Sequence, residues 1–454
     1  MSAAPSADTL PASVTLFGSG RAAACIGAVA LITMLAFEAL AVAAAMPAVA
    51  AALEGMPYYA LAFGGPLAAS VPGMVLAGRW CDRFGVVRAA AFGLGFFAVG
   101  LLAAGLAPSM PVLVAGRVLQ GLGGGMLGVV LYVGMAQVVP AALHPRLFSL
   151  FATAWVVPGL VGPSLAAWLV VYTSWRWVFL GALVALPVAA ALLMPAFAKL
   201  PKPAAAPAAE PQAGSRLVFA VVGAAGALLL HGAAGSRWPL LAAGFVMAWA
   251  AAWHLLPAGS LRVAPGLPAV IALRGLVAAA FATAEVFMPL ALTRDHGWSL
   301  MQAGWALSTG ALFWSVGSGL QARLSQAAAR ERALRAGLAL VSTGIACVAL
   351  TFTLPLSGVL IAVLTVGSWA LSGLGVGLAF PILSVQLLKI SAPAEQGRNS
   401  SALQLADALT TTAALAAAGL LVQQAQGSTW VMVFAALLAG TGALCARRVF
   451  AVGR

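Results

Sequence analysis

Three acidic side chains lie inside long apolar stretches, and they are the residues in the chain best placed to do chemistry. Of the 10 acidic residues, we place only Glu38, Glu285 and Asp407 in such stretches. An ionised carboxylate at the centre of a bilayer costs about 3 kcal/mol on insertion scales, so each must face a cavity, meet a cation or bind a proton. Burial favours the neutral carboxyl group, which allows proton exchange near physiological pH. We expect proton coupling at all three; the alternative is a position near a helix end that reaches the membrane surface. Gln386 and Gln404 could add polar contacts in a substrate cavity.

One arginine is predicted to serve the first of these acids. A guanidinium group keeps its charge, so Arg117 within a membrane helix needs an anion or water. We predict Glu38 as its partner, and protonation of Glu38 would then loosen the packing between their helices. The alternative is that Arg117, about two turns into its stretch, extends to the membrane surface. Arg274 and Glu285 share one stretch but lie about 16 Å apart at 1.5 Å per residue, so they cannot pair directly.

The composition fixes the kind of element that holds these residues. The 454 residues are 63% hydrophobic and 7% charged, whereas a soluble globular domain has about 25% charged residues. Apolar runs of about 20 residues without period-2 alternation predict membrane-spanning helices, which satisfy their own backbone hydrogen bonds. The net charge of +13 would suggest nucleic acid as a partner of a soluble protein. Here the basic residues lie singly or in small groups between apolar runs, so we expect a lipid bilayer and no nucleic acid.

The apolar runs predict an all-α polytopic membrane protein with 14 spans. The first six spans are 22–50, 57–78, 89–107, 111–139, 147–172 and 176–196. Two runs in the middle are 217–234 and 239–257. The last six are 268–292, 300–322, 334–353, 357–388, 400–422 and 429–446. The expected units are a tail at 1–21, a six-helix bundle at 22–196, a Pro/Ala-rich linker at 197–216, two additional helices at 217–257, a six-helix bundle at 268–446 and a tail at 447–454.

The basic residues also predict the orientation in the membrane. Lysine and arginine are enriched in cytoplasmic loops. With both termini in the cytoplasm, all of the 23 basic residues fall on the cytoplasmic side except Arg117, Arg176, Arg237, Arg274 and Arg294. We therefore expect a multi-pass protein of the cell (inner) membrane with both termini cytoplasmic.

A charged segment follows the second predicted span. The pattern Gly78-x-x-x-Asp82-Arg83-x-Gly85-x-x-Arg88 predicts a loop of about ten residues that turns back into the membrane. It resembles the loop between the second and third helices of the major facilitator superfamily of secondary transporters. The resemblance implies a cytoplasmic gate, in which Asp82 accepts hydrogen bonds from a helix end of the opposite half while Arg83 and Arg88 bridge to nearby groups. The alternative is a positive cluster that only sets topology.

Two further patterns resemble the 14-helix drug:proton antiporters of this superfamily. In the first span an acid, Glu38, is followed by eight residues and then by Pro47. In the fourth span Arg117-x-x-Gln120-Gly121 is similar to the Arg-x-x-Gln-Gly motif of that group. The resemblance implies that Glu38 and Arg117 act in proton coupling and that Gln120 lies in the substrate cavity.

A third pattern concerns helix bending. Gly159-x-x-Gly162-Pro163, followed by alanines, resembles the antiporter motif Gly-x-x-x-Gly-Pro-x-x-Gly-Gly. Small residues and proline let a helix bend and slide against a partner. Pro47, and Pro381 in a glycine-rich stretch of the second half, mark further helices that can bend. Ordinary packing of small residues is the alternative for the motif at Gly159, Gly162 and Pro163.

The resemblance implies a major facilitator fold and a proton-coupled exporter of hydrophobic or cationic small molecules that works by alternating access. The sequence has no phosphate-binding Gly-x-x-x-x-Gly-Lys run, so an ion gradient is the expected energy source. Three buried acids without a dense cluster of hydroxyl groups favour protons over sodium. We expect no enzymatic activity, no cofactor, no metal and no obligate protein partner. A proton-coupled metabolite symporter is the second hypothesis. A non-transporting scaffold or sensor is the third, and the insertion cost of the buried charges disfavours it.

Overall fold

The computed structural model describes residues 16–18, 20–140, 143–201, 211–232, 238–324, 326–354, 358–392 and 395–453. Within these ranges the chain is helical and contains no strand. The first group of helices is α1 Ala22–Ala52, α2 Tyr59–Phe84, α3 Val86–Gly105, α4 Met110–Val138, α5 His144–Thr153, α6 Val156–Tyr172 and α7 Arg176–Ala198. The middle pair is α8 Pro211–Gly232 and α9 Trp238–Leu255. The last group is α10 Leu267–Leu290, α11 Leu300–Ala322, α12 Ala327–Thr351, α13 Gly358–Ile390, α14 Gln396–Leu421 and α15 Gly427–Cys445.

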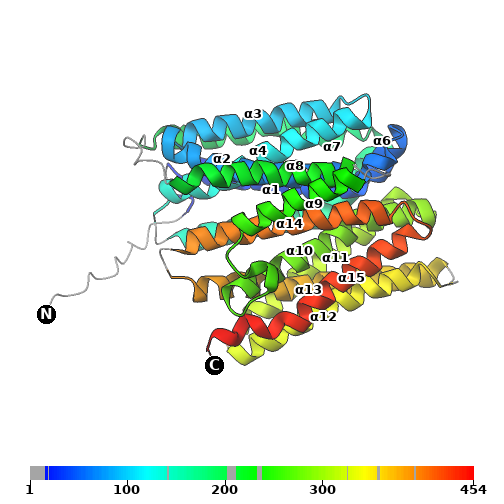
Figure 1. Cartoon of the computed structure of the whole chain (residues 1–454). Coiled ribbons are helices and arrows are strands. Elements are labelled where there is room, and N and C mark those ends of the chain that lie inside the picture. The colour runs from blue at the N-terminus through cyan, green and yellow to red at the C-terminus, as the bar shows by residue number, and fades with distance from the viewer. Residues whose placement is uncertain are drawn as a thin grey trace.

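The helices form two bundles, with the middle pair lying beside both (Figure 1). Ten helical segments in the described ranges are long and apolar enough to cross a membrane. Helix α8 packs on α2 and α14 through Ala220, which meets Val71 and Ala408 in one apolar cluster. We call the end of the molecule where α1 begins and α15 ends the terminal end, and the opposite end the distal end. The molecule is therefore an all-α polytopic membrane protein with six helical spans in each bundle, counting α5 and α6 as one span, and two additional helices.

The two bundles contact each other toward the distal end. Helices α6 and α11 pack closely there, with the hydroxyl oxygens of Ser164 and Ser308 3.0 Å apart. A Cβ atom added at Gly419 of α14 would lie 2.6 Å from that of Ala60 in α2. These contacts join the two bundles at the level of these residues.

The predicted loop at 78–88 is wrong. Helix α2 continues to Phe84 and α3 begins at Val86, so Gly85 alone joins them. Its φ of 84° lies in the region that only glycine adopts without strain. Asp82 and Arg83 therefore belong to the last turn of α2, where their charges can leave the membrane without ending the helix.

Two other boundaries differ from the prediction. The span expected at 147–172 is divided into α5 and α6, with a break at Ala154 and Trp155. The Ala154 carbonyl at this break accepts a hydrogen bond from the Thr33 hydroxyl, 3.3 Å away in α1. Helix α8 begins at Pro211, so the end of the segment expected as a linker is helical. The rest of that linker, at 202–210, lies outside the described residues.

Glycines allow α4 to lie directly against α2. A methyl group at Gly121 would overlap the carbonyl oxygen of Pro66. We expect Gly121→Ala to destabilise the folded protein by about 1 to 3 kcal/mol, because overpacking forces the two backbones apart. Thermal unfolding in detergent measures the effect. The matched control is Gly128→Ala in the same helix, where an added Cβ meets no atom within 4 Å. An equal loss of stability in both variants would contradict the argument.

Candidate functional site

The two charged residues predicted to pair in the first bundle do so. Glu38 of α1 and Arg117 of α4 form an ion pair through Oε1 and Nη1. Their side chains are only 10% and 5% exposed, respectively. The prediction that Glu38 is the partner of Arg117 is thus confirmed, and the alternative of an arginine that extends to the membrane surface is wrong. The pair joins two helices in the interior of the bundle.

A proline in α2 explains the second contact of this arginine. Pro66 has no N–H group, so it cannot donate to the carbonyl of Ala62 four residues earlier. The Nε–H of Arg117 donates to that carbonyl instead, with the two atoms 3.1 Å apart. One side chain therefore neutralises an acid on α1 and satisfies a backbone acceptor on α2. The proline four residues after Ala62 was a signal in the sequence that we did not use.

The predicted cavity residue Gln120 completes this cluster. Its Oε1 accepts a weak hydrogen bond from Nη1 of Arg117 at 3.4 Å. Its Nε2 is buried and has no hydrogen-bond partner among the described residues. The amide group therefore has donor capacity that the described part of the protein does not use.

A second ion pair, partly buried, lies in the other bundle. Nε of Arg274 in α10 lies 3.1 Å from Oδ2 of Asp407 in α14. Nη1 of the same arginine donates to the hydroxyl of Ser384 in α13 at 2.8 Å. The guanidinium carbon lies 3.8 Å from the ring centroid of Phe380. The group joins three helices of the second bundle.

We missed this pair in the sequence, where we compared Arg274 only with Glu285 on its own helix. A count of the charged residues inside the predicted spans would have indicated the pair. Arg117 and Arg274 are the two basic residues well inside predicted spans. Asp407 was the acid left for Arg274 once Glu38 had been assigned and Glu285 had been excluded by distance.

The third acid is placed differently. Glu285 of α10 is partly buried and forms no hydrogen bond or ion pair with any residue in the described ranges. One turn before it, Phe281 stacks on Trp369 with centroids 4.6 Å apart. Phe281 also meets the edge of Trp314 at 5.6 Å. The acid therefore lies beside an aromatic group and has no cation to balance it.

The aromatic residues connect this acid to the second ion pair. Trp314 of α11 meets Phe380 of α13 with centroids 5.2 Å apart, and Phe380 lies against Arg274. Phe281, Trp314 and Phe380 thus form a row of rings between the levels of Glu285 and Arg274. Such a row can contact the flat apolar part of a solute, since aromatic rings offer large surfaces and favour cations over their faces.

The residues of the predicted cytoplasmic gate are not engaged in this conformation. Asp82, Arg83 and Arg88 are exposed at the terminal end, while Gly78 and Gly85 are partly buried. None of the three charged residues forms a hydrogen bond or ion pair within the described part of the chain. The latch predicted from the resemblance stays a prediction for another conformation.

The helix-bending candidates lie at helix contacts. Gly159, Gly162 and Pro163 are buried in α6, and an added Cβ at Gly304 of α11 would lie 2.9 Å from the Pro163 carbonyl oxygen. The motif thus packs one bundle against the other. Of the remaining candidates, Pro47 is buried in α1, Pro381 lies within α13, Gln386 is partly buried and Gln404 is exposed.

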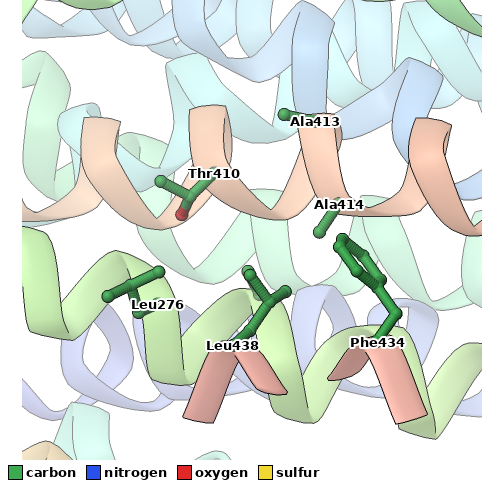
Figure 2. Close-up of a pocket in the computed structure, with 7 residues that line it drawn as sticks. Leu276, Thr410, Ala413, Ala414, Phe434 and Leu438 are labelled. Atoms are coloured by element: carbon green, nitrogen blue, oxygen red, sulfur yellow. The ribbon is translucent and has the colours of Figure 1, made fainter. Parts of the chain in front are cut away.

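A cavity of about 250 Å³ lies elsewhere, between α10, α14 and α15 (Figure 2). Leu276, Phe434 and Leu438 contribute apolar side chains to it, and none of the charged residues above lines it. The hydroxyl of Thr410 is already used, because it donates to the carbonyls of Gly275 and Ala406 at 2.8 and 2.6 Å. This cavity is therefore separate from the charged site.

We expect the second ion pair to depend on its complementary charges. Arg274→Ala and Asp407→Ala should each reduce transport activity strongly, because either change leaves an unpaired charge in the second bundle. The double variant Arg274→Asp/Asp407→Arg exchanges the two charges. Its transport activity should be at least about tenfold higher than that of either single variant if the attraction between the two charges is what matters. Thr343→Ala is the control, because Thr343 is exposed and its hydroxyl donates only within its own helix, α12. A double variant no better than the singles would show that the pair has a role beyond attraction.

Two facing helical bundles, each with an ion pair between its own helices, define a polytopic membrane transporter. The chain belongs to the Major Facilitator Superfamily, whose family model matches residues 26–367 and 270–454. It is a multi-pass membrane protein that transports small molecules, in a family and a fold that are not enzymes.

Known relatives agree with this assignment. A Mycobacterium tuberculosis (strain H37Rv) protein named "Probable multidrug-efflux transporter" is 27% identical over 402 residues, covering 84% of this chain and 83% of the relative. Multidrug resistance protein 3 of Bacillus subtilis is 30% identical over 148 residues, 33% of this chain and 29% of the relative. The xylose transporter XylE of E. coli, in a partially occluded inward open conformation, has the same fold, with a TM-score of 0.62 at 12% identity. That match covers 93% of this chain and 97% of XylE.

Proposed function

We propose that the protein is a proton-coupled exporter of hydrophobic or cationic small molecules that works by alternating access. The observation that carries this proposal is the placement of Glu285. Glu38 and Asp407 each have an arginine partner, whereas Glu285 has none among the described residues. An unpaired acid at membrane depth binds either a proton or a cation. The multidrug-efflux name of the Mycobacterium tuberculosis relative supports export as the direction.

The charge distribution supports a cytoplasmic terminal end. Arg79, Arg83 and Arg88 lie at the α2–α3 turn, and Lys389 and Arg398 lie where α13 ends and α14 begins. Loops rich in lysine and arginine stay in the cytoplasm. Contacts between the bundles toward the distal end, such as Ser164 with Ser308, support a conformation that faces the cytoplasm.

The proposed cycle uses competition at Glu285. In the inward-facing state the ionised carboxylate attracts a cationic or polarised substrate, and the aromatic row contacts its apolar part. When the distal side opens, a proton from outside binds Glu285 and weakens the hold on the substrate. The protonated carrier returns and releases its proton to the cytoplasm. Protonation of Glu38 or Asp407 would break an arginine pair and so favour the change in helix packing.

Transport in proteoliposomes tests the proposal. An imposed gradient with the acidic side inside should drive accumulation of an ethidium-like dye, because an antiporter moves substrate against the proton flow. A symporter would instead require the acidic side outside. Dye movement that does not respond to either gradient would refute proton coupling. The matched control is liposomes without protein, in which the passive pH response of the dye is measured.

A further inference from the structure

A buried tyrosine forms a hydrogen bond between the two bundles. The hydroxyl of Tyr59, at the first residue of α2, donates to the carbonyl of Val286 in α10, with 2.9 Å between the oxygens. The side chain is fully buried. Its ring contacts Phe63 of its own helix and Phe287 of α10, each with centroids 5.5 Å apart. A polar group on one bundle is thus fixed to the backbone of the other.

The acceptor lies in an irregular part of α10. Pro289 has no N–H group to donate to the carbonyl of Glu285 four residues earlier, so the helix lacks one hydrogen bond there. The helix then passes into a π-helical turn at Ala291–Asp295. Such turns are frequent at functional sites. The segment that follows Glu285 is therefore distinct in structure from the rest of α10.

Other contacts hold this segment from the far side. Asp295 accepts hydrogen bonds from Arg294 and from the hydroxyl of Ser428 at the start of α15. The segment is thereby fastened to its own bundle through α15. Within the described part of the chain, the Tyr59 hydroxyl makes the one hydrogen bond between this segment and the first bundle.

We propose that Tyr59 is the gate residue that shuts Glu285 off from the distal medium. The acceptor of its hydrogen bond is the residue directly after Glu285. Any separation of α2 from α10 that admits water from the distal side to Glu285 must therefore break the bond. The role deepens the proposed function, since it assigns to Tyr59 the control of proton access to the acid used in coupling.

Cysteine labelling tests the gate. Glu285→Cys is introduced after the native cysteines, Cys25, Cys81, Cys347 and Cys445, have been replaced by alanine. A membrane-impermeant thiol reagent is then added to the distal side of intact cells. Tyr59→Phe keeps the ring but removes the hydroxyl. It should raise the labelling rate on the order of fivefold, because one neutral hydrogen bond no longer favours the closed state.

The neighbouring tyrosine supplies the control. Tyr58 is 40% exposed, so Tyr58→Phe should leave the labelling rate unchanged. Tyr59→Phe should also slow labelling from the terminal side in inside-out vesicles, because the two faces open alternately. Equal rates in the two tyrosine variants would overturn the proposal, and so would faster labelling from both sides, which indicates local loosening. If Glu285→Cys expresses poorly, Ala282→Cys, one turn earlier in α10, reports on the same face.

The outcome is independent of the proposed function. Labelling measures access to α10 and needs neither substrate nor a proton gradient. If proteoliposomes show no proton-driven transport but Tyr59→Phe still speeds labelling from the distal side, proton coupling is refuted and the gate is supported. Unchanged labelling in a transporter that does couple to protons would refute the gate alone.

Discussion

Arg117→Met should leave little folded protein, whereas the double variant Glu38→Gln/Arg117→Met should recover the part of the loss that comes from the unpaired charge, although not the hydrogen bond to the Ala62 carbonyl. Removing one partner of a buried ion pair leaves an uncompensated charge, which costs about 3 to 5 kcal/mol. Replacing both partners by neutral groups of similar size removes the charge on each side. Both side chains are at least nine-tenths buried, so water cannot compensate for the missing partner. The yield of monodisperse protein and the thermal midpoint in detergent measure the effect.

The comparison separates two roles of this pair. Arg335→Ala is the control, because Arg335 is exposed on α12. The double variant should fold but lose the response of transport to pH, if the making and breaking of the pair contributes to coupling. A stable Arg117→Met single variant would contradict the structural argument. A double variant that folds and keeps full coupling would remove Glu38 from the proposed cycle.

Glu285→Gln should behave in the opposite way, with normal folding and no proton coupling. Glutamine has nearly the same shape as glutamate but cannot carry a proton. No cation is left unpaired, because Glu285 has no ion-pair partner among the described residues. One proton exchanged per substrate allows up to about a tenfold concentration ratio for each pH unit imposed, since one unit corresponds to about 1.4 kcal/mol. That ratio should fall to one in the variant.

Substrate exchange without a gradient distinguishes coupling from binding. At a raised dye concentration the Glu285→Gln transporter should still exchange labelled for unlabelled dye across the membrane, because the aromatic row still contacts the dye and the bundles can still change conformation. Glu54→Gln is the control, since Glu54 is an exposed acid in the loop after α1. Retention of gradient-driven accumulation by Glu285→Gln would exclude Glu285 as the proton carrier.

The sequence was sufficient for the parts of the site that depend on composition and on local pattern. Apolar runs located the helices, and the need of Arg117 for an anion identified Glu38. The Arg274–Asp407 pair depends on how α10 and α14 pack, which no local pattern reports. The Tyr59–Val286 contact could not be predicted for another reason. Its acceptor is a backbone carbonyl, which every residue type has, so the residue type at position 286 does not indicate it.

The wrong boundaries have physical explanations too. We ended the second span at Gly78 because charged residues follow it. Charges in the last turn of a helix can extend to the membrane surface, however, and the helix continues to Phe84. We predicted one continuous span at 147–172 because the whole segment is apolar. The carbonyl at its break is satisfied by Thr33, which lies far away in the sequence, so no local pattern indicates the break.

The contact between Arg117 and the Ala62 carbonyl makes positions 66 and 117 interdependent. Alanine at position 66 would restore the donor within α2 and give the Ala62 carbonyl a second, competing partner. Without arginine at position 117, in turn, Pro66 would leave that carbonyl unsatisfied in a dry interior. The order in which two substitutions are introduced therefore determines whether the intermediate protein is tolerated, so this proline and this arginine are best exchanged as a unit when the transporter is engineered.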